Sequence, residues 1–253
     1  MVKYLKKEDM SMKKFYNKYL NKALVIVIYI LMFYVFSLVL KDIFTKFVTN
    51  EETAIIYTIL INVIVDVTVF TAGILLLGKE LLSDFQVLKK TNAMFTFKHC
   101  AMFVGFVYAG NIAGSIISSI LGGNDSSVNQ QSIEYILFSK YGIFMILIIV
   151  VIGPILEELV FRKAIHKFLD NFKLPNWLIV LISSVLFGLI HVASAGDFIY
   201  IFSYLFMGVA LGTLERITKN IYPSIIVHMF INGMATALLI LLNKLTKFLP
   251  DMG

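Results

Sequence analysis

The sequence contains little cysteine and little charge. Its single cysteine, Cys100, excludes an internal disulfide framework and any metal site built from four cysteines. Aspartate, glutamate, lysine and arginine together make up 15% of the 253 residues, whereas a soluble domain contains about a quarter. Hydrophobic residues make up 59% of the chain. This composition excludes a soluble domain of this length and indicates a protein that lies in a lipid bilayer.

The hydrophobic residues occur in runs of about twenty, the length of helix that crosses a hydrocarbon core of about 30 Å. We predict an all-α fold, a polytopic transmembrane helical bundle with about seven spans. Their expected bounds are Ala23–Leu40, Thr53–Leu77, Cys100–Leu121, Tyr141–Leu156, Asn176–Ala193, Phe198–Leu214 and Pro223–Leu242. The second span carries Asn62 and Asp66 one helical turn apart. We expect both to form hydrogen bonds to other helices, and a role on the substrate path is the alternative.

The lysines cluster near the N-terminus and in alternate connecting segments. The net charge of +6 therefore indicates orientation in a membrane and does not indicate a nucleic-acid partner. By the positive-inside rule we expect a multi-pass protein of the cell (plasma) membrane with its N-terminus in the cytoplasm. Residues 41–52 and 122–140 are then external loops, and residues 79–99 lie along the cytoplasmic interface.

Two adjacent glutamates follow the apolar run that begins at Ile143, in the stretch Gly-Pro-Ile-Leu-Glu-Glu-Leu-Val-Phe-Arg at residues 153–162. A charge near the centre of a bilayer costs at least a few kcal/mol, so such residues usually have a function. On a helix, Glu158 and Arg162 stand four residues apart with the acid first, the favourable order for an ion pair. Glu157 points about 100° away. We expect Glu158 and Arg162 to form a structural ion pair and Glu157 to remain available for chemistry.

Two later spans carry polar residues at the same four-residue spacing. Phe187 and His191 share a helix face on one span, and His228 and Asn232 share a face on the last. Because polar groups in a membrane must find partners, we expect His191, His228, Asn232 and Glu157 to converge on one membrane-embedded cavity, with Phe187 lining its substrate side. His191 lies near the outer end of its span and His228 near the inner start of the last, so convergence requires tilted helices.

This set of side chains suits hydrolysis of an amide. A carboxylate and an imidazole can take a proton from water, and an imidazole or an amide can donate to a developing oxyanion. One carboxylate with two imidazoles, Glu157 with His191 and His228, also suits a catalytic zinc ion with three protein ligands. The residues leave both mechanisms open, zinc-dependent and metal-free. His99 and His166 fall in predicted cytoplasmic segments, and we assign them no role.

Three motifs occur in order on three spans: Glu157-Glu158-x-x-x-Arg162, Phe187-x-x-x-His191 and His228-x-x-x-Asn232. The ordered set, within roughly residues 140–240, resembles the signature of the CAAX-protease and bacteriocin-processing (CPBP or Abi) family of intramembrane endopeptidases. The resemblance implies that Glu157 and His191 activate a water molecule and that His228 and Asn232 stabilise the oxyanion. It also implies that the neighbouring glutamate and the arginine hold the site together. Both a metalloprotease and a metal-free glutamate mechanism are described for the family.

The resemblance further implies an endopeptidase that acts on a peptide or a membrane-protein substrate. Eukaryotic and archaeal relatives remove the last three residues of prenylated CAAX sequences, and bacterial relatives are associated with peptide maturation and bacteriocin self-immunity. The chain then divides into a basic cytoplasmic N-terminus (1–22), N-terminal transmembrane helices (23–130) and a catalytic transmembrane core (131–245). In one departure, the turn at residues 218–221 reads Thr-Lys-Asn-Ile, where relatives often carry glycine.

Two other functions compete with the protease. A non-catalytic membrane scaffold or immunity protein would need neither both histidines nor Asn232. A cation or proton transporter more often has paired broken helices in two repeated halves, whereas Pro154 and Pro223 both lie in the second half. The sequence also contains no His-Glu-x-x-His, Gly-x-Ser-Gly or Gly-x-Gly-Asp motif, which are typical of other membrane proteases. The complete set of motifs favours the endopeptidase.

Overall fold

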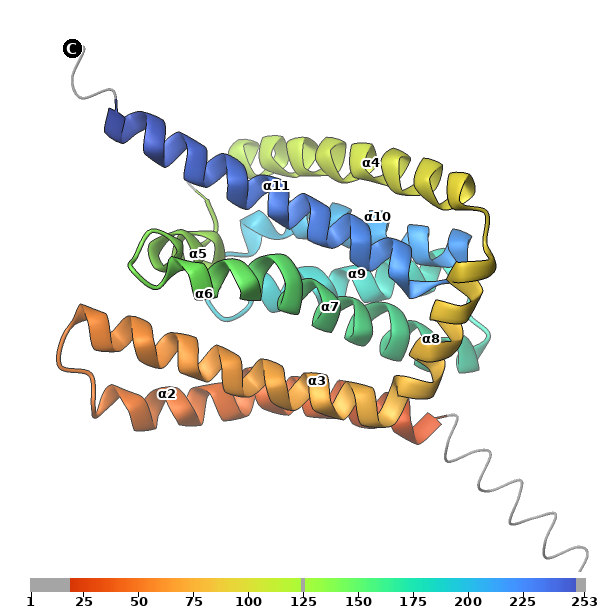
Figure 1. The fold of residues 1–253 in the computed structure, drawn as a ribbon, viewed down its shortest axis with the longest axis horizontal. Helices are drawn as coiled ribbons and strands as arrows, with labels where there is room; N and C mark the ends of the chain where they lie inside the picture. Colours follow the sequence, from red (N-terminus) through yellow and green to blue (C-terminus); the bar gives the residue numbers. More distant parts are fainter. Residues whose placement is uncertain (1–18, 124–125, 249–253) are drawn as a thin grey trace, which may run out of the picture.

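The computed structural model describes residues 19–123 and 126–248, so most of the predicted basic N-terminus lies outside the described residues. Within these ranges the chain forms helices and no strand, which confirms the predicted all-α bundle (Figure 1). The principal helices are Tyr19–Thr45 (with η1 Leu31–Phe36 and α2 Ser37–Thr45), α3 Glu51–Lys90, α4 Ala93–Ile120, α5 Val128–Leu137, Gly142–Phe172, α9 Asn176–Val192, α10 Ile201–Thr218 and α11 Ile221–Phe248. The helix Gly142–Phe172 consists of α6 Gly142–Leu147, η2 Ile148–Ile152, α7 Gly153–Glu158, η3 Leu159–Ile165, α8 His166–Leu169 and η4 Asp170–Phe172.

Six of these helices are long and apolar enough to cross a membrane. The remaining predicted span, the fifth, corresponds to α9, which is apolar but has only 17 residues, about 25 Å at 1.5 Å per residue. His191 lies in the last turn of this short helix, and His228 lies near the start of α11. The oblique course of α11 across the bundle (Figure 1) supplies the tilt that their convergence requires.

Helix α3 is longer than the predicted span because both ends are well capped. Asn50 and Thr53 form a reciprocal capping box at its start, two glutamates follow in the first turn, and two lysines lie in the last. These charges complement the helix dipole. The final turns of α3 bend across one end of the bundle (Figure 1), where we expected an interfacial segment. There Asp84 accepts a hydrogen bond from Lys163 at 2.7 Å and anchors the bend.

The segment at residues 122–140, which we expected only as an external loop, contains helix α5. Ser127 caps its start by accepting a hydrogen bond from the backbone N–H of Gln130 at 3.2 Å. Asp197, in the connection between α9 and α10, accepts from the N–H of Val128 at 2.7 Å. Ile136 is buried near the end of α5. The helix is therefore fixed to the bundle at both ends and places its polar residues beside the interior.

Helix α10 packs against both α4 and α9, and small residues make these contacts close. A Cβ atom added at Gly114 of α4 would lie 2.6 Å from Cα of Ser203. One added at Gly208 of α10 would lie 3.0 Å from Cα of Ser184 on α9. Larger residues would force these helices apart, so glycine sets the separation.

The turn between α10 and α11 explains why glycine suits it in relatives. Lys219 has φ 51°, in the left-handed region, which a residue with a side chain adopts at some cost and glycine adopts freely. The Asn220 side chain then accepts a hydrogen bond from the N–H of Tyr222 at 3.0 Å and caps α11. The departure from glycine therefore concerns only the conformation of the turn.

Candidate active site

The helix Gly142–Phe172 is irregular where it carries the two glutamates. Two π-helical stretches, η2 (Ile148–Ile152) and η3 (Leu159–Ile165), flank the short helix α7 (Gly153–Glu158). Such π-helical segments are rare and occur frequently at functional sites. The two glutamates therefore lie at the end of a short α-helical segment between two irregular ones.

Pro154 explains part of this irregularity, since proline has no N–H to donate. The N–H of Gly153 bonds the carbonyl of Ile148 in the π register. In the same register the next carbonyl, that of Ile149, would need the missing N–H of Pro154. Asn232 of α11 fills this place, since its Nδ2 donates to the Ile149 carbonyl at 3.0 Å. The last helix thus satisfies the carbonyl that proline leaves free and fixes the glutamate-bearing segment against α11.

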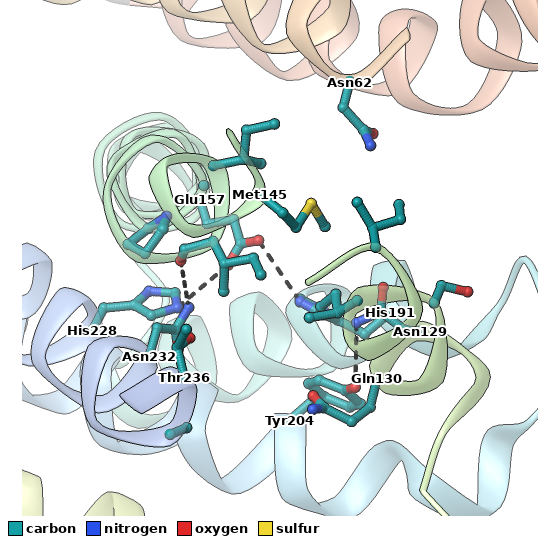
Figure 2. A pocket seen from close by; sticks show the side chains of 18 of the residues that line it. Asn62, Asn129, Gln130, Met145, Glu157, His191, Tyr204, His228, Asn232 and Thr236 are labelled. Atoms are coloured by element: carbon teal, nitrogen blue, oxygen red, sulfur yellow. Dashed lines mark hydrogen bonds and ion pairs between the residues drawn. The ribbon is translucent and has the colours of Figure 1, made fainter. Parts of the chain in front are cut away.

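The carboxylate of Glu157 lies between the two predicted imidazoles (Figure 2). Its Oε1 is 3.7 Å from Nε2 of His191, and its Oε2 is 3.5 Å from Nε2 of His228. All three line one cavity of about 430 Å³, together with Phe187 and Asn232. The structure therefore brings all five predicted cavity residues together, while their chemical roles remain predictions.

His191 is oriented by its own helix and by α10. Its Nδ1 lies 2.8 Å from the carbonyl oxygen of Phe187, one turn earlier. Because a carbonyl only accepts hydrogen bonds, Nδ1 carries a hydrogen, and Nε2 faces Glu157. The ring of Tyr204 stacks on the imidazole, with centroids 4.3 Å apart and planes at 20°. Sequence reasoning missed Tyr204, which no motif marks.

His228 lies between both glutamates. Its Nδ1 is 3.0 Å from Oε1 of Glu158, so Nδ1 donates, and its Nε2 faces Glu157. Glu158 therefore orients a histidine of the cavity in addition to pairing with the arginine. The sequence does not predict this second contact, because the two residues lie 70 positions apart in the chain.

The predicted ion pair between Glu158 and Arg162 is confirmed. Nε of Arg162 is 3.2 Å from Oε2 of Glu158, and both side chains are fully buried. Neither of these two atoms forms a hydrogen bond within the described residues, so the contact is an ion pair alone. The guanidinium also donates from Nη2 to the Gly208 carbonyl at 3.3 Å and lies 5.0 Å from the ring centroid of Phe187. Helix α10 and an aromatic face therefore share in stabilising the charge.

Polar residues of α3 form another wall of the cavity. Thr58, Asn62 and Asp66 stand at intervals of four on one face, and all three line it. Neither Asn62 nor Asp66 forms a hydrogen bond to another helix within residues 19–123 and 126–248, so the interhelical role predicted for them is wrong. Helix α5 adds Asn129, whose Nδ2 donates to the hydroxyl of Tyr204 at 3.4 Å. The four-residue spacing on α3 was the one sequence signal for this wall.

The site residues do not form a group suited to a metal ion. Among the described residues, no three histidine, cysteine or acidic side chains are placed to hold one. His191 and His228 approach opposite oxygens of Glu157, each through Nε2. The arrangement suits protons more than a zinc ion with three ligands.

Comparisons with known proteins agree with the geometry. The family described as Type II CAAX prenyl endopeptidase Rce1-like matches residues 139–234. The chain is 34% identical over 126 residues to the putative membrane peptidase YdiL of Bacillus subtilis, covering 50% of this chain and 49% of that protein. It is 35% identical over 127 residues to the membrane-embedded CAAX protease MroQ of Staphylococcus aureus, covering 48% and 49%. The chain belongs to the Rce1-like CAAX endopeptidase family.

A further relative is the UPF0177 protein YbdI of Lactococcus lactis, 31% identical over 139 residues that cover 53% of this chain and 73% of that protein. The chain matches about half the length of the other two, and no solved structure matches it. With its six apolar helices, this member of the Rce1-like family is an integral multi-pass membrane protein. The family match contains the glutamates, histidines and Asn232, whereas α3 and α5 lie outside it.

Proposed function

We propose that the protein is an intramembrane endopeptidase of the CAAX prenyl protease type that hydrolyses a peptide bond in a peptide or membrane-protein substrate. It lies in the plasma membrane with its N-terminus in the cytoplasm. One observation carries the proposal: a carboxylate, Glu157, lies between two oriented imidazoles in a cavity within a bundle of apolar helices. Membership of the Rce1-like family and the names of the relatives support it.

Glu157 is the general base of this mechanism. The Nε2 lone pair of neutral His191 and the nearest oxygen of Glu157 are both acceptors, and their separation of 3.7 Å suits a water molecule that donates to both. Glu157 takes one proton as the water oxygen attacks the carbonyl carbon of the peptide. A positioned base of this kind typically contributes about 10²–10⁴ in rate.

His228 and Asn232 stabilise the developing oxyanion. In this mechanism His228 acts as an imidazolium, which Glu158 stabilises by accepting a hydrogen bond from Nδ1 at 3.0 Å. Its Nε2–H then donates to the oxyanion, as does the second N–H of the Asn232 amide. When the carbon–nitrogen bond breaks, Glu157 returns its proton to the leaving amine. The products are an amine and a carboxylic acid, which then releases its remaining proton to solvent.

No step of this mechanism passes through a metal ion, because Glu157 and the two histidines do not form a three-ligand group. For the physiological reaction we propose the maturation of a secreted peptide or self-immunity to a bacteriocin. Both tasks require cleavage of a peptide chain at or in the membrane.

A comparison of peptides tests the proposal. Cells expressing equal amounts of folded wild type and of the Glu157→Gln variant are compared by mass spectrometry of their membrane and secreted peptides. We expect peptides whose formation requires Glu157, and we expect purified wild type in lipid nanodiscs to produce the same cleavage. Identical peptide sets from the two strains would favour the non-catalytic scaffold, and charge movement across proteoliposomes without cleavage would favour the transporter.

A further inference from the structure

Asp66 is a carboxylate that the proposed mechanism does not use. It is 6% exposed on α3 and lines the same cavity as Glu157. No hydrogen bond or ion pair joins it to any of the described residues. Removal of a charged group from water costs several kcal/mol unless a partner compensates for it. A buried carboxylate that faces a cavity without a protein partner therefore indicates that a ligand bound in the cavity supplies the partner.

The charge of the cavity indicates which group that is. Among the described residues that line it, the carboxylates are Asp66 and Glu157, and there is no lysine or arginine. The two imidazoles lie beside Glu157, and one of them is also held by Glu158. None of these interactions neutralises Asp66. The complement of an unpaired carboxylate in such a place is a cationic nitrogen, which forms strong charge-assisted hydrogen bonds with it.

Asn62 provides a neutral partner for the same group. It precedes Asp66 by one turn on the same face of α3 and also lines the cavity. In Figure 2 its side chain points from α3 toward the space that Glu157 and His191 border from the other side. An amide oxygen beside a carboxylate accepts a second hydrogen from an ammonium or guanidinium group.

We infer that Asp66, with Asn62, forms a subsite for a cationic nitrogen of the peptide substrate, either a lysine or arginine side chain or a free N-terminal amine. The inference rests on the proposed peptidase function and adds a specificity-determining element to it. Because α3 lies outside the family match at residues 139–234, this subsite selects a substrate for this chain, while the matched segment performs the hydrolysis.

The test measures binding, so that it does not depend on cleavage. The Glu157→Gln variant in nanodiscs is titrated with fluorescent synthetic apolar peptides in three forms: one with a single lysine, one with norleucine in its place, and one with an acetylated N-terminus. We expect a cationic peptide to bind about ten- to a hundred-fold more tightly than its neutral counterpart. Loss of the preference with norleucine identifies the side chain as the ligand, and loss with acetylation identifies the terminal amine.

Substitution of Asp66 completes the test. Asp66→Asn keeps the shape and should abolish the preference, whereas Asp66→Glu should retain part of it. Asp42→Asn is the matched control, because it removes an exposed carboxylate from the preceding helix and should change nothing.

Equal binding of charged and neutral peptides would overturn the inference even if Asp66→Asn did not fold. If charge preference is present but no peptide is cleaved by wild type, the subsite stands and the peptidase function fails. If wild type cleaves a peptide without charge preference, the peptidase function stands and the subsite fails.

Discussion

Among the described residues, two histidines contact a carboxylate through Nδ1, and these two pairs differ in what lies beyond the histidine. In one, Nδ1 of His228 is 3.0 Å from Glu158. In the other, Nδ1 of His166 is 2.8 Å from Glu215. Both histidines are buried, and the helix Gly142–Phe172 supplies one member of each pair. By residue type and contact distance the two pairs are nearly equivalent.

The two pairs differ in the surroundings of Nε2, the second ring nitrogen of each histidine. Nε2 of His228 faces Glu157 and the cavity, whereas Nε2 of His166 is buried and has no hydrogen-bond partner among the described residues. A Cβ added at Gly212 would lie 3.5 Å from that nitrogen, which shows that α10 packs closely there. The same pair can therefore serve catalysis only where the second nitrogen reaches a cavity, and elsewhere it holds helices together.

The largest expected effect is on Glu157. We expect Glu157→Gln to reduce cleavage about 10²–10⁴-fold in purified protein, because an amide cannot act as a base. Glu215→Gln changes the pair of His166 and Glu215, which does not line the cavity of Glu157 and is called the enclosed pair below. This variant should leave the rate per folded molecule close to that of wild type. Cleavage of a peptide identified by mass spectrometry measures both. Near-normal activity of folded Glu157→Gln would show that the cavity beside His228 is not a catalytic site. The pair of His228 and Glu158 would then have no more functional role than the pair of His166 and Glu215.

The next largest effect concerns Glu158 and distinguishes its contact with Arg162 from its contact with His228. Glu158→Gln or Arg162→Met alone leaves an unpaired buried charge, at a cost of about 3–5 kcal/mol, so each should lower the yield of folded protein. The double variant should recover most of that yield. It should also recover part of the activity, since the glutamine oxygen still accepts from Nδ1 of His228. Size-exclusion profiles and cleavage rates together check this. Normal yield for both single variants would contradict the structural role.

A smaller effect is expected in the enclosed pair. Replacing His166 by Phe removes the hydrogen bond to Glu215 and leaves the carboxylate with only its contact to Arg216, 3.5 Å away. Loss of a buried partner costs about 1–3 kcal/mol, so the thermal midpoint should fall while the activity of the folded fraction is unchanged. A fall in the rate constant of the folded fraction would show that this pair also serves the reaction.

The smallest effect is expected from removal of metal. Because Glu157 and the two histidines do not form a three-ligand group, we expect prolonged incubation with a chelator to leave cleavage within about two-fold of its starting rate. Loss of a catalytic zinc ion would lower the rate far more, because its Lewis-acid contribution amounts to several kcal/mol. Activity lost to the chelator and restored by zinc alone would show that the site rearranges around a metal ion.

Local patterns in the sequence determined the features that depend on neighbouring residues. The length of the apolar runs predicted the all-α membrane bundle, and the four-residue spacing predicted the contact of Glu158 with Arg162 and the shared face of Phe187 and His191. Both contacts are present, at 3.2 Å between charged atoms and 4.8 Å between ring centroids. These predictions succeed because helical geometry alone relates such residues.

Only the tertiary structure decided which helix faces meet. The contact of Glu158 with His228 joins different helices, as does the hydrogen bond from Asn232 to the Ile149 carbonyl. Among the described residues, the polar face of α3 lines the cavity and forms no hydrogen bond to another helix. The tertiary structure therefore favours the substrate-path alternative for Asn62 and Asp66 over the interhelical one. A helix pattern defines a face but leaves open its rotation and tilt against neighbours, because those depend on close packing at positions such as Gly208 and on the oblique course of α11.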